Sequence, residues 1–196
     1  MQALIDTGRA FFAQRGWEPF PFQEKAWRAY LQGDQGIVNA PTGSGKTYSL
    51  GIAVLLEFLR ESGPTPTTAN PGLRAIWITP IRALTREIQS ALQEAADALG
   101  LHWQIAIRSG DTTAAERARQ KRKPPQVLIT TPESLHLLLA SSGYSQYFSQ
   151  LKTVIVDEWH ELLGSKRGVQ MELALSRLRG PLPNLKVWGI SATIGN

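Results

Sequence analysis

The chain has 196 residues, 42% of them hydrophobic, which is enough for one well-buried core. It contains no cysteine, so disulfide frameworks and cysteine-ligated zinc sites are excluded, and a reducing cytoplasmic compartment is expected. Residues 1–16 lack the pattern of a signal peptide, and no later stretch approaches the roughly 20 apolar residues of a membrane span. We therefore expect a soluble protein with a single α/β domain.

The formal net charge of +5 arises entirely in the second half of the chain. Residues 101–196 carry twelve Lys and Arg against seven Asp and Glu, whereas the two kinds balance in residues 1–100. Five of these cations lie within residues 117–123. Such a run can attract the phosphates of a nucleic acid, but it is equally typical of the solvated face of a helix.

Short apolar runs rich in β-branched residues alternate along the chain with longer segments of helical period, which predicts a parallel sheet with helical crossovers. In chain order, we expect a helix within residues 1–16, a helix at 22–31, a strand at 36–39, a helix at 46–61, a strand at 74–79, a helix at 82–99, a strand at 103–107, a helix at 113–120, a strand at 127–130, a helix at 132–139, a strand at 153–156, a helix at 169–178 and a strand at 186–190. Residues 62–72, rich in proline and threonine, are expected to form an exposed loop. The strands are nearly all apolar, as in a sheet that is covered by helices on both faces.

A candidate phosphate-binding loop follows the first strand and precedes a helix. Its sequence is Ala40-Pro41-Thr42-Gly43-Ser44-Gly45-Lys46-Thr47. The glycines allow backbone N–H groups to turn toward one anion, and the start of the helix adds the positive end of its dipole. Lys46 is expected to neutralise the β and γ phosphates, and the Thr47 hydroxyl to bind Mg²⁺. Ala40 replaces the first glycine of the strict Walker pattern, while the GKT triplet is intact.

Two carboxylates, Asp157 and Glu158, directly follow the apolar strand at 153–156. The carboxyl ends of parallel strands are where open α/β sheets keep their ligand sites. Asp157 is expected to hold Mg²⁺, and Glu158 to orient and polarise the attacking water. Acidic residues at this place can also simply cap the next helix, so the interpretation depends on the upstream phosphate loop.

The phosphate loop, the tetrad Asp157-Glu158-Trp159-His160 and the later Ser191-Ala192-Thr193 resemble motifs I, II and III of superfamily 2 helicases, in that order. The tetrad together with Glu161-Leu162-Leu163-Gly164 and Lys166-Arg167-Gly168 more narrowly resembles Lhr-type (large helicase-related) proteins, including the ligase-associated DExH-box helicases. This resemblance runs from about Phe20 to the terminus. It implies a three-layer RecA-like P-loop NTPase domain, with a mostly parallel sheet flanked by helices, and ATP and Mg²⁺ as cofactors. Residues 1–196 would be the first motor domain of a longer ATP-dependent helicase connected with DNA repair.

The resemblance also assigns further residues. Phe20-Pro21-Phe22-Gln23 resembles the adenine-reading Q motif, in which Gln23 would bind the adenine edge and Phe20 or Trp17 would pack on the ring; Phe20 and Phe22 could equally be core residues. Three segments resemble elements that hold one nucleic-acid strand, and their expected contact residues are Thr79, Pro80, Arg82, Gly110, Asp111, Thr131, Pro132 and Glu133. The partner is expected to be single-stranded DNA, with RNA or a DNA–RNA hybrid as alternatives, although Thr-Pro before a helix is also an ordinary capping sequence. His160, Ser191 and Thr193 would couple the nucleotide state to this face.

The sequence lacks the arginine-containing motif of a second RecA-like domain, which would complete the ATP site. We therefore expect this chain alone to turn over ATP very slowly, since an arginine supplied from outside is typically worth ~10³ to 10⁵ in rate. Three alternatives stay open at this stage. They are a double-strand translocase that moves without unwinding, a different P-loop enzyme such as a small-molecule kinase or GTPase, and a nucleic-acid-binding domain without activity. The absence of an Asn-Lys-x-Asp segment argues against a GTPase, and the acid pair suits water activation better than a kinase reaction.

Overall fold

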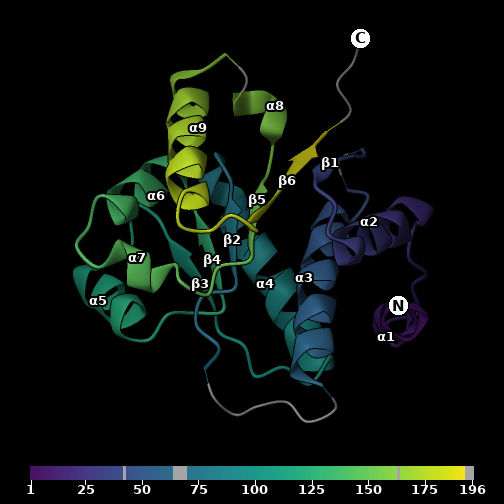
Figure 1. Cartoon of the computed structure of the whole chain (residues 1–196). Coiled ribbons are helices and arrows are strands. Elements are labelled where there is room, and N and C mark those ends of the chain that lie inside the picture. The colour runs from purple at the N-terminus through teal and green to yellow at the C-terminus, as the bar shows by residue number, and fades with distance from the viewer. Residues whose placement is uncertain (42, 64–69, 163, 193–196) are drawn as a thin grey trace.

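A computed structural model describes residues 1–41, 43–63, 70–162 and 164–192 of the chain. In these residues a central parallel sheet of six strands is covered by helices on both faces (Figure 1). The strand order is β1-β6-β5-β2-β4-β3. The bounds are β1 Gly36–Asn39, β2 Ala75–Ile78, β3 Ile105–Arg108, β4 Val127–Thr130, β5 Thr153–Val156 and β6 Lys186–Ser191. The predicted α/β architecture with a parallel sheet is confirmed.

The last strand in sequence, β6, lies between the first strand and β5. Its parallel register places Asn39 of β1 beside Ser191, and Val156 of β5 beside Gly189. The segments that follow β1 and β5 therefore leave the same edge of the sheet on either side of the end of β6. This agrees with the strand placement that the helicase resemblance implies.

The helices form the two outer layers (Figure 1). Their bounds are α1 Gln2–Ala13, α2 Pro21–Gln32, α3 Lys46–Ser62, η1 Arg82–Leu84, α4 Thr85–Ala98, α5 Ala114–Arg122, α6 Pro132–Leu139, α7 Tyr144–Tyr147, α8 Trp159–Leu162 and α9 Lys166–Arg179. Among the described residues, no helix combines the length and the apolar character needed to cross a bilayer.

Alternate residues of the strands pack in two separate hydrophobic cores, because successive side chains of a strand point to opposite faces of the sheet. Trp77 and Ile155 face the layer of α1, α2, α3 and α4, whereas Ile76 and Val154 face the layer of α6, α7 and α9. All four side chains are buried. This burial on both faces explains why the strands read as continuous apolar runs.

The structure differs from the sequence-based element bounds at several ends. The strand expected at 103–107 begins at Ile105 because the backbone of Gln104 is instead bonded to Gln126, whose side chain accepts the Gln104 N–H at 2.7 Å. The helix expected at 82–99 opens with a 3₁₀ turn, η1, before α4. The helix expected at 169–178 begins earlier, at Lys166, because the Ser165 hydroxyl caps it. The short helices α7 and α8 were not predicted, since four residues are too few to show a helical period.

Candidate functional site

The phosphate loop lies between the end of β1 and the start of α3, as the sequence predicts. Gly43 and Gly45 have φ angles of +79° and +72°, in the left-handed region that other residues rarely adopt. Helix α3 begins at Lys46, immediately after Gly45. The loop thus combines left-handed turns with a helix N-terminus, the geometry that favours an anion. Thr42 lies outside the described residues.

Lys46 points back into this loop, where its Nζ donates a hydrogen bond to the Ala40 carbonyl at 2.7 Å. The Ser44 hydroxyl donates to the Pro41 carbonyl at 2.6 Å, so the loop is closed on itself. An ammonium held by one carbonyl keeps two further donors, which a phosphate oxygen can accept.

Gln23, the expected adenine reader, is buried beneath the loop and is only 1% exposed. Its Nε2 donates to the Gly45 carbonyl at 2.9 Å, and its Oε1 accepts the Phe20 N–H at 2.8 Å. In this structure Gln23 therefore supports the phosphate loop, and adenine binding by Gln23 stays a prediction. Phe20 and Trp17 are about half exposed, so both are accessible for packing on a ring, and Phe20 is not a core residue.

Asp157 lies directly after β5, with only 7% of the residue exposed. Trp77 Nε1 donates to one carboxylate oxygen at 3.3 Å, and the Glu158 N–H donates to the other at 2.9 Å. Burial raises the pKa of Asp157, and the Trp77 bond, the Glu158 N–H and the positive charge of Lys46 act in the opposite direction. The influence of Lys46 on Asp157 agrees with their placement at the same edge of the sheet, after β1 and after β5.

Glu158 has a φ of +49°, and it is the one non-glycine residue with positive φ in the described part of the chain. Such a backbone conformation is costly for a residue with a side chain, and it tends to persist at functional sites. The Glu158 carboxylate lies 3.5 Å from His160 Nε2. The opposite ring nitrogen of His160, Nδ1, lies 3.0 Å from the Ser191 hydroxyl.

This His160–Ser191 contact joins the segment after β5 to the end of β6. The Ser191 carbonyl in turn accepts the Ala40 N–H at 3.3 Å, at the start of the phosphate loop. The structure therefore brings two of the three predicted coupling residues into contact, next to both halves of the nucleotide site. The third, Thr193, lies outside the described residues.

The predicted strand-binding segments follow β2, β3 and β4, which are neighbours in the sheet. Thr79 and Thr131 are fully buried, and their hydroxyls accept the N–H groups of Ile81 and Ser134 at 3.3 Å. Thr131 caps α6 and Pro132 follows it, so the capping interpretation of this segment holds. A contact through either hydroxyl would need a rearrangement.

Of the other predicted contact residues, Arg82, Gly110 and Asp111 are exposed, Pro80 and Glu133 are half-buried, and Pro132 is buried. Arg82 Nη1 lies 3.3 Å from the Asp111 carboxylate, and the two line a hollow of about 430 Å³ between the segments after β2 and β3. Asp111 and Glu133 carry carboxylates, which repel a phosphate. In this structure Asp111 contacts Arg82 and Glu133 contacts Arg167.

Two residues of the site were missed in the sequence. Trp77 appeared only as a strand residue, although it is the indole donor to Asp157. Arg167 was noted only as part of a resemblance, yet its Nε donates to Glu133 at 2.6 Å. Neither pairing has a local signal, because the partners are 80 and 34 residues apart.

A parallel sheet with a glycine-lined phosphate loop after β1 and an acid pair after β5 defines a P-loop NTPase domain of the RecA-like type. Residues 20–196 match the sequence profile of the DEAD/DEAH box helicases. The chain belongs to the DEAD/DEAH box helicase family.

Two proteins similar to this chain in sequence are helicases of the Lhr type. The chain is 35% identical over 199 residues to the Lhr helicase/uracil glycosylase of Escherichia coli, covering 95% of this chain and 13% of that protein. It is 36% identical to the ATP-dependent helicase Lhr-Core of Methanothermobacter thermautotrophicus, covering 83% of this chain and 20% of the relative. The predicted resemblance to Lhr-type proteins is confirmed, and the chain spans only a small part of these relatives.

Among solved structures, the Mycobacterium smegmatis helicase Lhr, bound to single-stranded DNA and AMP-PNP, is 34% identical and superposes with a TM-score of 0.81, covering 96% of this chain and 24% of that one. The DEAD-box helicase Mss116 bound to single-stranded RNA superposes with a TM-score of 0.78 at 23% identity, which shows the shared fold.

Proposed function

We propose that this chain is the ATP-binding motor domain of a longer Lhr-type helicase, which couples ATP hydrolysis to movement along a nucleic acid and to its unwinding. The observation that carries the proposal is the placement of two segments at one edge of the sheet: the phosphate loop with Lys46 follows β1, Asp157 follows β5, and only β6 lies between these two strands. A phosphate-binding cation and a metal-binding acid in this arrangement suit nucleoside triphosphate hydrolysis. The similarity to an Lhr helicase solved with single-stranded DNA and AMP-PNP supports this assignment.

In this proposal the phosphate loop surrounds the triphosphate of ATP. Backbone N–H groups of the loop would bind the phosphates, Lys46 would neutralise the β and γ oxygens, and Gln23 would read the adenine edge. The loop residues are Pro41, Thr42, Gly43, Ser44, Gly45, Lys46 and Thr47.

The acid after β5 suits Mg²⁺. Asp157 offers carboxylate oxygens that each receive one N–H donor, and a cation would relieve the cost of burying its negative charge. Within the described residues no group of three or more His, Cys, Asp or Glu side chains is placed to hold a metal. Mg²⁺ would therefore take its other ligands from Thr47, the phosphates and water, which is its usual preference. When bound, the ion would supply positive charge that offsets the negative charge developing on the phosphates.

Glu158 is the proposed general base that orients and deprotonates the attacking water. Its positive φ turns the backbone sharply after Asp157, and the carboxylate lies within reach of His160. His160 and Ser191, with Thr193, would then report the nucleotide state to the strand-binding face.

The proposed partners are a nucleic-acid strand and a second RecA-like domain of the same protein. Single-stranded DNA is the proposed strand, with RNA or a DNA–RNA hybrid as alternatives, and the segments after β2, β3 and β4 would hold it. A role in DNA repair and a cytoplasmic location are also part of the proposal.

The test compares Lys46→Ala and Glu158→Gln in the full-length protein. Glu158→Gln should retain binding of a fluorescent ATP analogue and lose DNA-stimulated hydrolysis by about 10² to 10⁴, the usual contribution of a general base. Lys46→Ala should lose both. Retained hydrolysis in both variants would refute the proposed site. A strand-displacement assay on the unaltered protein then separates a helicase from a translocase that does not unwind.

A further inference from the structure

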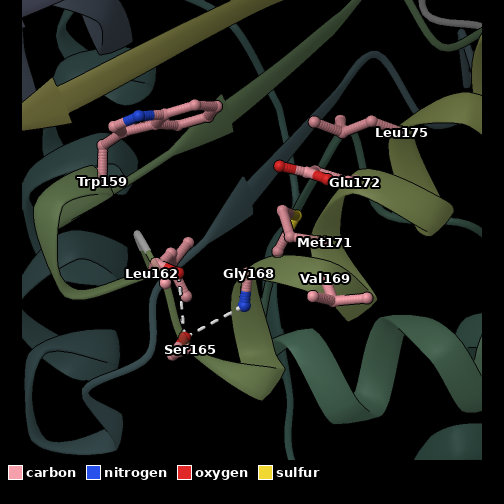
Figure 2. A pocket seen from close by; sticks show the side chains of 9 residues that line it. Trp159, Leu162, Ser165, Gly168, Val169, Met171, Glu172 and Leu175 are labelled. Atoms are coloured by element: carbon pink, nitrogen blue, oxygen red, sulfur yellow. Dashed lines mark hydrogen bonds between the residues drawn. The ribbon is translucent and has the colours of Figure 1, made fainter.

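The turn between α8 and α9 connects the acid pair to a basic segment that the ATP site does not use. Helix α8 begins one residue after Glu158, and α9 begins at Lys166. The Ser165 hydroxyl lies between the two helices, donating to the Leu162 carbonyl at 2.9 Å and accepting the Gly168 N–H at 3.1 Å. Figure 2 shows both bonds at one end of an apolar pocket. The end of α8 and the start of α9 are therefore held together by one side chain.

Gly168 makes this junction tight. A Cβ atom built at this position would lie 2.1 Å from the Leu162 carbonyl oxygen, closer than any real contact. The obstructing atom belongs to the backbone and cannot swing away. Only a residue without a side chain allows α9 to start this close to the end of α8, where the Ser165 hydroxyl bonds both helices.

Arg167, in that first turn, reaches two of the strand-binding segments. Its Nε donates to the Glu133 carboxylate at 2.6 Å, and its Nη1 approaches the Pro80 carbonyl at 3.5 Å. Glu133 lies in the first turn of α6, and Pro80 follows β2. Although burial acts to raise the pKa of Glu133, its own backbone N–H and the Arg167 bond lower it overall, so the carboxylate is held in its charged form. One guanidinium thus joins the segments after β2 and β4 to the start of α9.

We propose that Arg167 is a positioning residue that fixes the segments after β2 and β4 relative to each other and, through the Ser165 bonds at the start of α9, links both to the helix after the acid pair. Glu133 then serves to orient Arg167 rather than to contact the strand. This inference rests on the proposed function, because it concerns how the same strand-binding face responds to the nucleotide site. The planar fork of arginine suits this role, since it bonds a carboxylate and a carbonyl at once.

The first test measures DNA-stimulated ATP hydrolysis by the full-length protein as a function of oligodeoxythymidine concentration. Arg167→Gln should raise the concentration that gives half-maximal stimulation about two- to fivefold, in line with the modest strength of a half-exposed ion pair. Lys166→Gln removes the same charge from the neighbouring position, and Lys166 has no bond to these segments among the described residues, so it should have little effect. Arg167→Lys keeps the charge without the fork and should recover only part of the loss. An equal effect of Lys166→Gln and Arg167→Gln would overturn the proposal in favour of simple charge attraction.

The second test uses Glu133→Gln, which makes the protein more positive by one charge. Simple electrostatics predicts tighter binding of DNA, whereas a positioning role predicts weaker stimulation, as in Arg167→Gln. A lower or unchanged DNA concentration for half-maximal stimulation would overturn the proposal. Lys46→Ala, assayed alongside, distinguishes a failure of the proposed ATP site from a failure of the positioning role. If it loses hydrolysis while Arg167→Gln behaves as the unaltered protein, the ATP site stands and the positioning role fails.

Discussion

A buried ion pair at the amino end of the sheet offers a quantitative test of the fold. Glu57 of α3 accepts a hydrogen bond from Lys186 Nζ at the start of β6, and the two side chains are 10% and 11% exposed. The second Glu57 oxygen accepts the Tyr30 hydroxyl at 2.9 Å. The Lys186 ammonium also lies 3.8 Å from the centre of the Tyr30 ring.

Replacing Glu57 with Gln should lower the free energy of unfolding by about 3 kcal/mol. Breaking a buried pair by removing one partner typically costs about 3–5 kcal/mol, because a charge is left uncompensated. We expect the lower end, since Gln can still accept the Tyr30 hydroxyl and the Tyr30 ring still attracts the ammonium. Burial already lowers the pKa of Lys186, so this amine can also lose its proton when the carboxylate is gone. For a domain of this size, about 3 kcal/mol corresponds to a fall in Tm of about 6–12 °C.

Thermal and urea unfolding, followed by circular dichroism, measure this loss in the 196-residue chain. The double variant Glu57→Gln with Lys186→Met is the matched control. It removes the unpaired charge and should recover most of the lost stability. A fall of less than about 2 °C in the single variant, or a double variant with the summed losses of the two single ones, would contradict this account.

Three further outcomes are expected at the candidate site. Because the pKa of Asp157 is raised in the folded chain, its contribution to stability is fully present below the unfolded pKa and is lost as the pH rises through the folded pKa. Asp157→Asn should therefore gain stability relative to the unaltered chain as the pH rises from acidic to neutral. A difference in unfolding free energy between the two proteins that stays constant across that range would exclude the effect. Trp77→Phe removes a donor from this carboxylate and should cost about 1–3 kcal/mol in urea unfolding, whereas no loss would show that the indole bond is dispensable. Ser191→Ala removes the partner of His160 and, at about 1 kcal/mol for a hydrogen bond, should reduce DNA-stimulated hydrolysis about fivefold without changing ATP binding; a parallel loss of ATP affinity would point to a structural role instead.

The sequence indicated most of the fold because the relevant signals are local. Strands buried on both faces must be apolar at successive positions, so β4 and β5 were predicted with the bounds that the structure shows. The two glycines and Lys46 form a recognisable loop for the same reason, since the left-handed turns and the helix start occur within a few residues. The predicted helix ends agree less well with the structure. Side-chain caps such as Ser165 decide where a helix begins, and the spacing of apolar residues does not show them.

What the sequence by itself determined is the chemistry at each strand end: a phosphate loop after one strand and an acid pair after another. Only the tertiary structure decided which distant groups complete these sites. Trp77 bonds Asp157, His160 meets Ser191, and Arg167 holds Glu133 across 80, 31 and 34 residues of chain. Such pairs depend on strand order and on how helices seat on the sheet, and the local pattern of either partner is the same whether or not they meet. The physical reason is that a hydrogen bond requires atoms within about 3 Å of each other, a precision that periodicity and composition do not carry.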